Sequence, residues 1–233
     1  MVFVVAEIGV NWNGDFDLVK EMMKNAKLAD CNAVKFQSFD KSIVKEHKKK
    51  DMLLKTSISK NNIEEINRIA KSVGIEWFCT PMYSAAVELL EPYVNRYKIR
   101  NFDAKEFVKN QISELVQKIL DTNKKIIVSS HVKPSTCKMY NHEKISWLYV
   151  VPKYPCQLSD LDFSLLNEFD GYSNHCPNII APLSAVILGA KIIEVHITSD
   201  KNKNFVDNVV SFDYSELKQL VGFIRESESI KIK

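Results

Sequence analysis

What the sequence lacks excludes several classes of protein at the outset. Its 233 residues contain no uninterrupted apolar run of the roughly 18 residues that a membrane-spanning helix needs. Lysine and arginine (32) barely exceed aspartate and glutamate (29), so the formal net charge is only +3 and gives no sign of a nucleic-acid partner. With 45% hydrophobic and 26% charged residues, the composition excludes a disordered or fibrous chain.

Paired cysteines and a secretion signal are also missing. The five cysteines are scattered without CxxC spacing, which argues against a zinc module or a disulfide framework and predicts a reduced, cytoplasmic location. The first residues, MVFVVAEIGV, have no basic segment ahead of the apolar run and no small-residue cleavage site, so they are predicted to form a strand. Glycine (6) and proline (7) are few for this length.

What is present is a regular alternation of strand and helix patterns along the chain. The predicted strands are residues 3–9, 33–39, 76–81, 96–101, 125–130, 146–152, 171–175 and 191–197. Helical spacing of apolar residues separates most of them, including one helix predicted from Ala104 to about Leu120 and a last one from Ser215 to Glu226. The segment between the fifth and sixth strands is too polar to hold a convincing helix.

This alternation predicts the fold class. Strands that alternate with helices pair in parallel through right-handed crossovers, and eight such units indicate a closed (β/α)8 TIM barrel of the α/β class. No GxGxxG motif favours a dinucleotide-binding fold instead. We expect one domain over residues 1–233, shortened around its fifth β/α unit.

Polar side chains collect at the predicted ends of the strands, which is where a TIM barrel has its active site. Charged residues inside otherwise apolar strands are unusual, because burying an unpaired charge is costly. The candidates are Glu7, Asn11, Asn13, Lys35, Gln37, Thr80, Lys98, Ser129, Ser130, Tyr154, Ser173, His175, Glu194 and His196.

Two lysines in the middle of strands predict an anion site. Lys35 and Lys98, with the hydroxyl groups of Thr80, Ser129 and Ser173 at neighbouring strand ends, have the chemistry to hold a phosphate and a carboxylate. The alternative is that each lysine extends along the apolar surface to place its charge at the barrel rim.

Two histidines predict a metal site. His175 and His196 end adjacent strands, and Glu7 and Glu194 are expected nearby. Such a ligand set is too sparse for a closed structural site, so water or substrate would complete the coordination. The alternative is that both are histidines with satisfied hydrogen bonds in the core.

Taken together, these segments resemble the N-acetylneuraminate (sialic acid) synthase family. The segments AEIGVNWNGD, AVKFQSF, CTP, YKI, IVSS, KYP, YSNH and EVHIT occur in the family's order and roughly at its spacing, over about residues 3–226. The resemblance implies a (β/α)8 enzyme that condenses phosphoenolpyruvate with an N-acylated amino sugar, or a related aldose, to a nonulosonic-type acid in surface carbohydrate biosynthesis.

The resemblance also implies a role for each candidate. The implied catalytic residues are Glu7, Asn13, Lys35 and Lys98. The implied substrate-binding residues are Gln37, Thr80, Ser129, Tyr154, Ser173 and Asp207, of which Tyr154 and Asp207 border the sugar. The implied metal ligands are His175 and His196, for Mn²⁺ or Mg²⁺.

Several segments depart from the family pattern. Trp12 replaces the histidine of an NHNG motif, residues 100–103 replace small residues after YKI, and residues 129–132 replace a glycine-containing STGM turn. The family's C-terminal antifreeze-like domain is expected to be absent.

Two other functions stay open beside the synthase. One is a catalytically degenerate barrel that serves as a binding or regulatory subunit, and the other is a different metal-dependent aldolase on the same scaffold. In each case we expect small-molecule ligands and neither a nucleic-acid nor a membrane partner. A homodimer and a separate chain that supplies a lid are both open.

Overall fold

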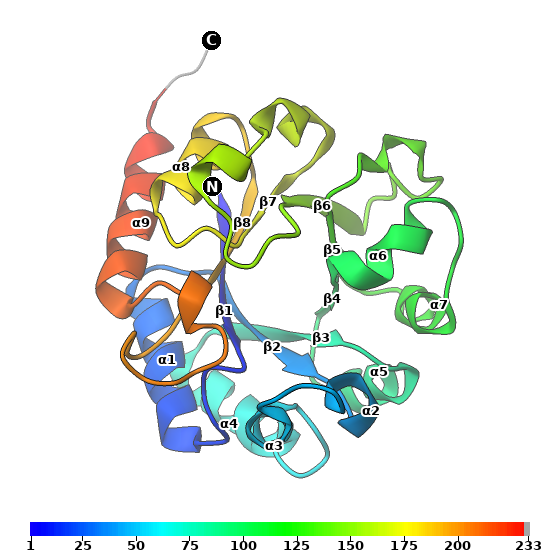
Figure 1. The fold of residues 1–233 in the computed structure, drawn as a ribbon, viewed down its shortest axis with the longest axis vertical. Helices are drawn as coiled ribbons and strands as arrows, with labels where there is room; N and C mark the ends of the chain where they lie inside the picture. The colour runs from blue at the N-terminus through cyan, green and yellow to red at the C-terminus, as the bar shows by residue number, and fades with distance from the viewer. Residues whose placement is uncertain (231–233) are drawn as a thin grey trace.

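Eight parallel strands close into a barrel in chain order, in a computed structural model that describes residues 1–230 (Figure 1). The strands are β1 (Phe3–Gly9), β2 (Ala33–Ser38), β3 (Glu76–Pro81), β4 (Arg96–Ile99), β5 (Lys125–Ser130), β6 (Ile145–Val150), β7 (Gly171–Asn174) and β8 (Ile192–His196). The barrel closes where β1 pairs with β8, which confirms the predicted (β/α)8 architecture.

Helices surround the strands on the outside of the barrel (Figure 1). They are α1 (Phe16–Leu28), α2 (Lys41–Val44), α3 (Lys50–Thr56), α4 (Ile63–Val73), α5 (Ser84–Leu90), α6 (Asn101–Phe107), α7 (Glu114–Asp121), α8 (Ile180–Ile187) and α9 (Tyr214–Ser227). Only the 3-10 turn η1 (Pro134–Thr136) follows β5, as the polar sequence predicts, and β6 is followed by the turns η2 (Leu158–Asp160) and η3 (Phe163–Glu168). A further turn, η4 (Asn208–Val210), precedes α9. None of the helices in the described part of the chain has the length and apolar character to cross a membrane.

The single helix predicted from Ala104 to Leu120 is wrong, because α6 and α7 are separate. Asn110 adopts a left-handed conformation (φ 68°), which an asparagine tolerates and a helix does not continue through. Ser113 then starts α7, since its side chain accepts a hydrogen bond from the amide of Val116 at 3.3 Å.

Trp12, where the family motif has a histidine, is part of the core. Only 1% of it is exposed, and its indole Nε1 donates to the carbonyl of Thr56 at 3.2 Å. Its ring lies 5.9 Å from that of Phe16 and 6.2 Å from that of Phe36. The indole therefore anchors the loop after β1 to the end of α3 instead of pointing into the barrel.

A glycine sets the distance between β7 and β8. Gly171 pairs with Ile192 in the sheet, and a Cβ at this position would lie 1.9 Å from the carbonyl oxygen of Ile192. No other residue allows the two backbones to approach this closely. Because both strands carry site residues farther along, this contact fixes where those residues lie.

Candidate active site

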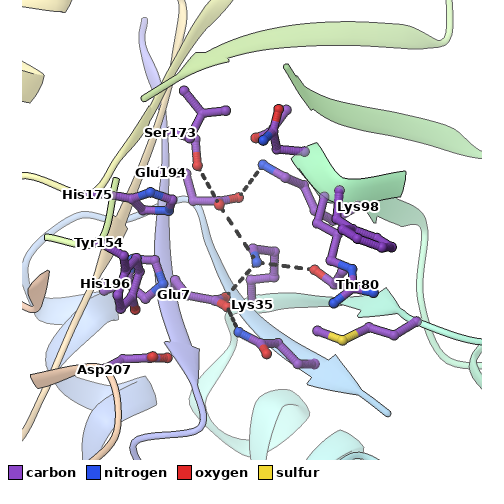
Figure 2. Close-up of a pocket in the computed structure, with 17 residues that line it drawn as sticks. Glu7, Lys35, Thr80, Lys98, Tyr154, Ser173, His175, Glu194, His196 and Asp207 are labelled. Atoms are coloured by element: carbon purple, nitrogen blue, oxygen red, sulfur yellow. Dashed lines mark hydrogen bonds and ion pairs between the residues drawn. The ribbon is translucent and has the colours of Figure 1, made fainter. Parts of the chain in front are cut away.

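A cavity of about 400 Å³ opens at the C-terminal end of the barrel (Figure 2). Of the strand-end candidates, Asn11 and Ser130 do not line it, and the Ser130 hydroxyl donates instead to the carbonyl of Val132 at 2.7 Å. The cavity is lined by every residue to which the resemblance gives a role except Asn13, namely Glu7, Lys35, Gln37, Thr80, Lys98, Ser129, Tyr154, Ser173, His175, His196 and Asp207. They converge because parallel strands of a barrel present their carboxyl ends on one side.

Asn13 does not reach this cavity. It is exposed, has a left-handed backbone (φ 49°), and lines a separate surface hollow with Asp15 and Phe205. The loop is held by Trp12, whose anchoring in the core turns the next residue toward solvent.

The bottom of the cavity is formed by Glu7, Lys35, Lys98, Ser173 and Glu194, which we call the floor. Lys35 Nζ lies 2.9 Å from Glu7 Oε2, and Lys98 Nζ lies 2.9 Å from Glu194 Oε2. The Ser173 hydroxyl donates to Glu194 Oε1 at 3.0 Å (Figure 2). No more than 5% of any lysine or glutamate side chain in these pairs is exposed, so the alternative in which the lysines reach the barrel rim is wrong.

Further contacts link the two ion pairs into one network. Lys35 Nζ also donates to Thr80 Oγ1 at 3.2 Å and lies 3.7 Å from Glu194 Oε1. Gln37 Nε2 donates to Glu7 Oε1 at 2.9 Å. Glu194 therefore contacts both lysines and is the centre of the floor, a role that its position in the sequence alone did not reveal.

The network sets the protonation of its members. Burial alone would raise the pKa of Glu194, but the two lysines outweigh it and lower the pKa to about 2. Burial lowers the pKa of Lys98 to about 8, against the opposing effect of Glu194. Burial would also lower the pKa of Lys35, but Glu194 and Glu7 together raise it. At neutral pH Glu194 is thus an anion held between two lysine cations.

The hydroxyl of Ser129 offers a donor to a ligand. The residue is 3% exposed and lines the cavity, and its Oγ has no hydrogen-bond partner among residues 1–230. A buried hydroxyl without a partner is costly unless a ligand or water satisfies it.

The two histidines lie side by side at the cavity wall, with ring centroids 5.6 Å apart. The Tyr154 ring packs against both, at 4.9 Å from His175 and 5.8 Å from His196. Burial, and next the neighbouring His196, lower the pKa of His175 to about 4, so its imidazole is neutral at physiological pH.

The donor set of this histidine pair fits a divalent metal ion. His175 Nδ1 lies 3.2 Å from the carbonyl oxygen of Val151, which fixes Nδ1 as the protonated nitrogen and leaves Nε2 as a ligand. His196 Nδ1 is buried without a partner in the described chain. Within residues 1–230 no group of three or more His, Cys, Asp or Glu side chains is arranged around a metal position. The pair thus provides two ligands, and water or substrate must provide the others.

A glycine at the end of β1 allows three polar side chains to meet. A Cβ on Gly9 would lie 3.0 Å from Glu7 Oε1, 3.1 Å from Asp207 Oδ2 and 3.2 Å from Gln37 Nε2, and its φ of 53° is left-handed. Asp207 itself is held by its backbone amide, which donates to Asn11 Oδ1 at 3.1 Å. Asn11 was a strand-end candidate and proves to be a buried residue that positions Asp207.

The mouth of the cavity is formed by Arg100, Asn101, Phe102 and Tyr154, which we call the rim. The first three were not predicted as site residues, nor were Met82 and Val150, which also line the cavity. Asn101 is held in place by its Oδ1, which accepts from the backbone amide of His131 at 3.1 Å. A signal for the rim was available, because Arg100 to Phe102 directly follow the strand that carries Lys98.

The fold and the cavity define the class of protein, a (β/α)8 barrel with a charged, buried cavity at the C-terminal end of its strands. The model of the NeuB family matches residues 22–232, and the chain belongs to this family.

Named relatives match almost the whole chain. The N,N'-diacetyllegionaminic acid synthase of Legionella pneumophila is 30% identical, over 98% of this chain and 72% of the relative. A pseudaminic acid synthase of Campylobacter jejuni is 28% identical, over 98% of this chain and 74% of the relative. Among solved structures, the N-acetylneuraminic acid (sialic acid) synthetase of Leptospira borgpetersenii superposes with a TM-score of 0.86 at 27% identity, over all of this chain and 87% of that one.

Proposed function

We propose that the protein condenses phosphoenolpyruvate with an N-acylated amino sugar to form a nonulosonic-type acid, in the cytoplasmic biosynthesis of a surface carbohydrate. The observation that carries the proposal is the floor, in which two buried lysines are held by two buried carboxylates beside the unpartnered hydroxyl of Ser129. Relatives named as synthases of legionaminic and pseudaminic acid support the reaction type.

Phosphoenolpyruvate would bind over the floor. Its phosphate and carboxylate need cations and hydroxyl donors, and the cavity offers Lys35, Lys98, Thr80, Ser129 and Ser173. An ammonium has three donors, and Lys98 makes only one hydrogen bond within the described residues, so it can serve the ligand without leaving Glu194. The carboxylates thus orient the lysines before the substrate arrives.

The histidine pair would hold the divalent ion, Mn²⁺ or Mg²⁺. His175 would ligate through Nε2, since Nδ1 faces the Val151 carbonyl, and the neutral form of the imidazole is available above about pH 4. When bound, such an ion supplies a Lewis acid that polarises the aldehyde oxygen of the sugar. Tyr154 packs against both rings and would keep them in this orientation.

The proposed reaction forms a bond between C3 of phosphoenolpyruvate and the aldehyde carbon of the sugar. Water adds at C2, and inorganic phosphate leaves as the C2–O bond breaks. Lys35 and Lys98 would neutralise the charge that the departing phosphate carries. Because the pKa of Lys98 is about 8, its Nζ can hold or release a proton near neutral pH, and this Nζ would face the phosphate. Gln37, Tyr154 and Asp207 line the part of the cavity that is left for the sugar.

Release of inorganic phosphate tests this function. The purified protein is incubated with phosphoenolpyruvate, MnCl₂ and a panel of N-acetylhexosamines, and we expect release that requires a sugar. Lys98→Met should abolish it, whereas Lys109→Met, which removes a charge from an exposed surface ion pair, should not change it.

The same assay separates the two other functions. A degenerate binding subunit would release no phosphate with any sugar, and His175→Ala would be silent in its ligand binding. A different aldolase would condense the sugar with pyruvate and not need the phosphate.

A further inference from the structure

Arg100 lies at the junction of two spaces. It lines the main cavity and also an adjoining pocket of about 210 Å³, together with Gln37, Met82 and Asp207. It follows β4 in an extended conformation (φ −75°, ψ 160°), two residues after Lys98. Residues two apart on a strand share a face and are separated by about 7 Å, so Arg100 stands one step above the floor.

The guanidinium of Arg100 is held in place by its neighbours, but not all of its hydrogen-bond donors have a partner. Its Nε donates to Asp103 Oδ2 at 2.6 Å, and its centre lies 5.1 Å from the ring of Phe102. Its two terminal nitrogens make no hydrogen bond to any residue in the described range 1–230. Arg100 lines the cavity and Asp103 does not, so this ion pair holds the arginine through its Nε from outside the cavity and leaves the terminal nitrogens free. The arginine side chain is 30% exposed, which keeps it reachable from solvent.

The position argues for the sugar and against phosphoenolpyruvate as the partner of Arg100. Under the proposed function, the two anionic groups of phosphoenolpyruvate are bound by the two buried lysines and by the hydroxyl groups of Thr80, Ser129 and Ser173. An aldose whose aldehyde lies at the floor has a chain that continues toward the mouth of the cavity.

We propose that Arg100 binds an anionic substituent, phosphoryl or carboxylate, on the acceptor sugar at the end remote from its aldehyde. The inference rests on the proposed condensation. A guanidinium with two free terminal nitrogens is planar and can donate two parallel hydrogen bonds to a phosphoryl or a carboxylate group. A neutral sugar hydroxyl cannot accept both of these hydrogen bonds in the same way. The enzyme therefore prefers acidic acceptors to neutral ones.

The test compares a neutral N-acetylhexosamine with its 6-phosphate and its 6-carboxylate as acceptors, at saturating phosphoenolpyruvate with MnCl₂. We expect a higher kcat/KM for an acidic acceptor in the unaltered enzyme, and the better of the two identifies the group. Arg100→Met should reduce that preference about 10- to 100-fold, the loss typical of hydrogen bonds to a charged group. Arg100→Lys should restore part of it, since the charge returns without the fork.

Lys105→Met is the matched control. Lys105 belongs to helix α6, which begins directly after Arg100, and lies 5.7 Å from the Phe102 ring, but it is exposed and does not line the cavity. If both variants lose the preference equally, the effect comes from net charge and the inference is wrong. It is also wrong if the unaltered enzyme does not distinguish the acceptors, or if Arg100→Met raises the KM for phosphoenolpyruvate instead.

Calorimetry separates this inference from the proposed reaction. If no sugar is condensed, the proposed reaction fails, but 6-phosphate binding that is lost in Arg100→Met still supports the role of Arg100. If the 6-phosphate binds no more tightly than the neutral sugar, or equally well to both proteins, the role of Arg100 is overturned.

Discussion

The floor and the rim of the cavity follow different rules. In the floor, Lys35 and Lys98 are each held by a carboxylate at 2.9 Å and are almost completely buried. At the rim, Phe102 is 68% exposed and Tyr154 is 45% exposed. Buried charges survive only in pairs, so the floor tolerates little change, whereas the rim carries no such constraint. Under the proposed function, this difference assigns the chemistry to the floor and the selection of the acceptor to the rim.

The largest effect is expected from breaking the floor at its centre. Glu194→Gln leaves Lys98 without its counterion, and removing one partner of a buried pair costs about 3–5 kcal/mol of unfolding free energy. Phosphate release should fall on the order of 100-fold or more, as when a preorganised electrostatic contact is removed. Chemical denaturation and the phosphate assay measure the two effects.

A double variant separates stability from activity. In Lys98→Met/Glu194→Gln the uncompensated charge is gone, so most of the stability should return while the activity stays lost. If the single variant Glu194→Gln were as stable and active as the unaltered protein, the floor would not be the charged core of the site.

Gly171→Ala should separate the strands that carry Ser173 and Glu194 of the floor. The new methyl group would collide with the Ile192 carbonyl oxygen, so we expect a loss of roughly 1–3 kcal/mol or more. Gly222→Ala in α9 is the control, because a Cβ there meets nothing within 4 Å, and it should stabilise the protein by about 0.5–1 kcal/mol. Equal melting temperatures for the two variants would contradict the close approach of β7 and β8.

The charge of the floor should also make the affinity for phosphoenolpyruvate depend on pH. The pKa of Lys98 is lowered to about 8, so this lysine is charged below pH 8 and becomes neutral as the pH rises through that value. An anion binds the charged form, so Kd should rise by about tenfold per pH unit well above pH 8. Calorimetric titrations at several pH values measure this. Lys98→Met should weaken binding at every pH and remove this dependence, whereas an unaltered protein with constant affinity up to pH 10 would rule out Lys98 as the anion's partner.

The smallest effect is expected at the rim. Phe102→Ala removes an exposed ring that lies beneath the cationic groups of Arg100 and Lys105, so stability should change by less than about 0.5 kcal/mol. The Kd of the Phe102→Ala variant for phosphoenolpyruvate should equal that of the unaltered protein. A marked loss of phosphoenolpyruvate binding would show that the rim shares the task of the floor.

The sequence was sufficient to predict what depends on local pattern. Strand and helix periodicity predicted the barrel, and charged residues in apolar strands predicted which side chains line the cavity. The break between α6 and α7 was missed because it depends on the left-handed backbone of a single residue, Asn110.

Pairing across the barrel could not be predicted in the same way. Glu194 meets Lys35 and Lys98 only because closure of the sheet brings β8 against β1 and across from β4, and no spacing along the chain records this. Asn13 was placed outside the cavity by the tertiary anchoring of Trp12, which a motif comparison does not contain.

The most direct test of the central claim is a crystal structure of the protein with phosphoenolpyruvate and MnCl₂. We predict a phosphoenolpyruvate anion within hydrogen-bond distance of Lys35, Lys98 and Ser129, and a metal ion bound by His175 and His196. Density for the ligand elsewhere, with the floor still closed by its own ion pairs and no metal at the histidines, would contradict the account.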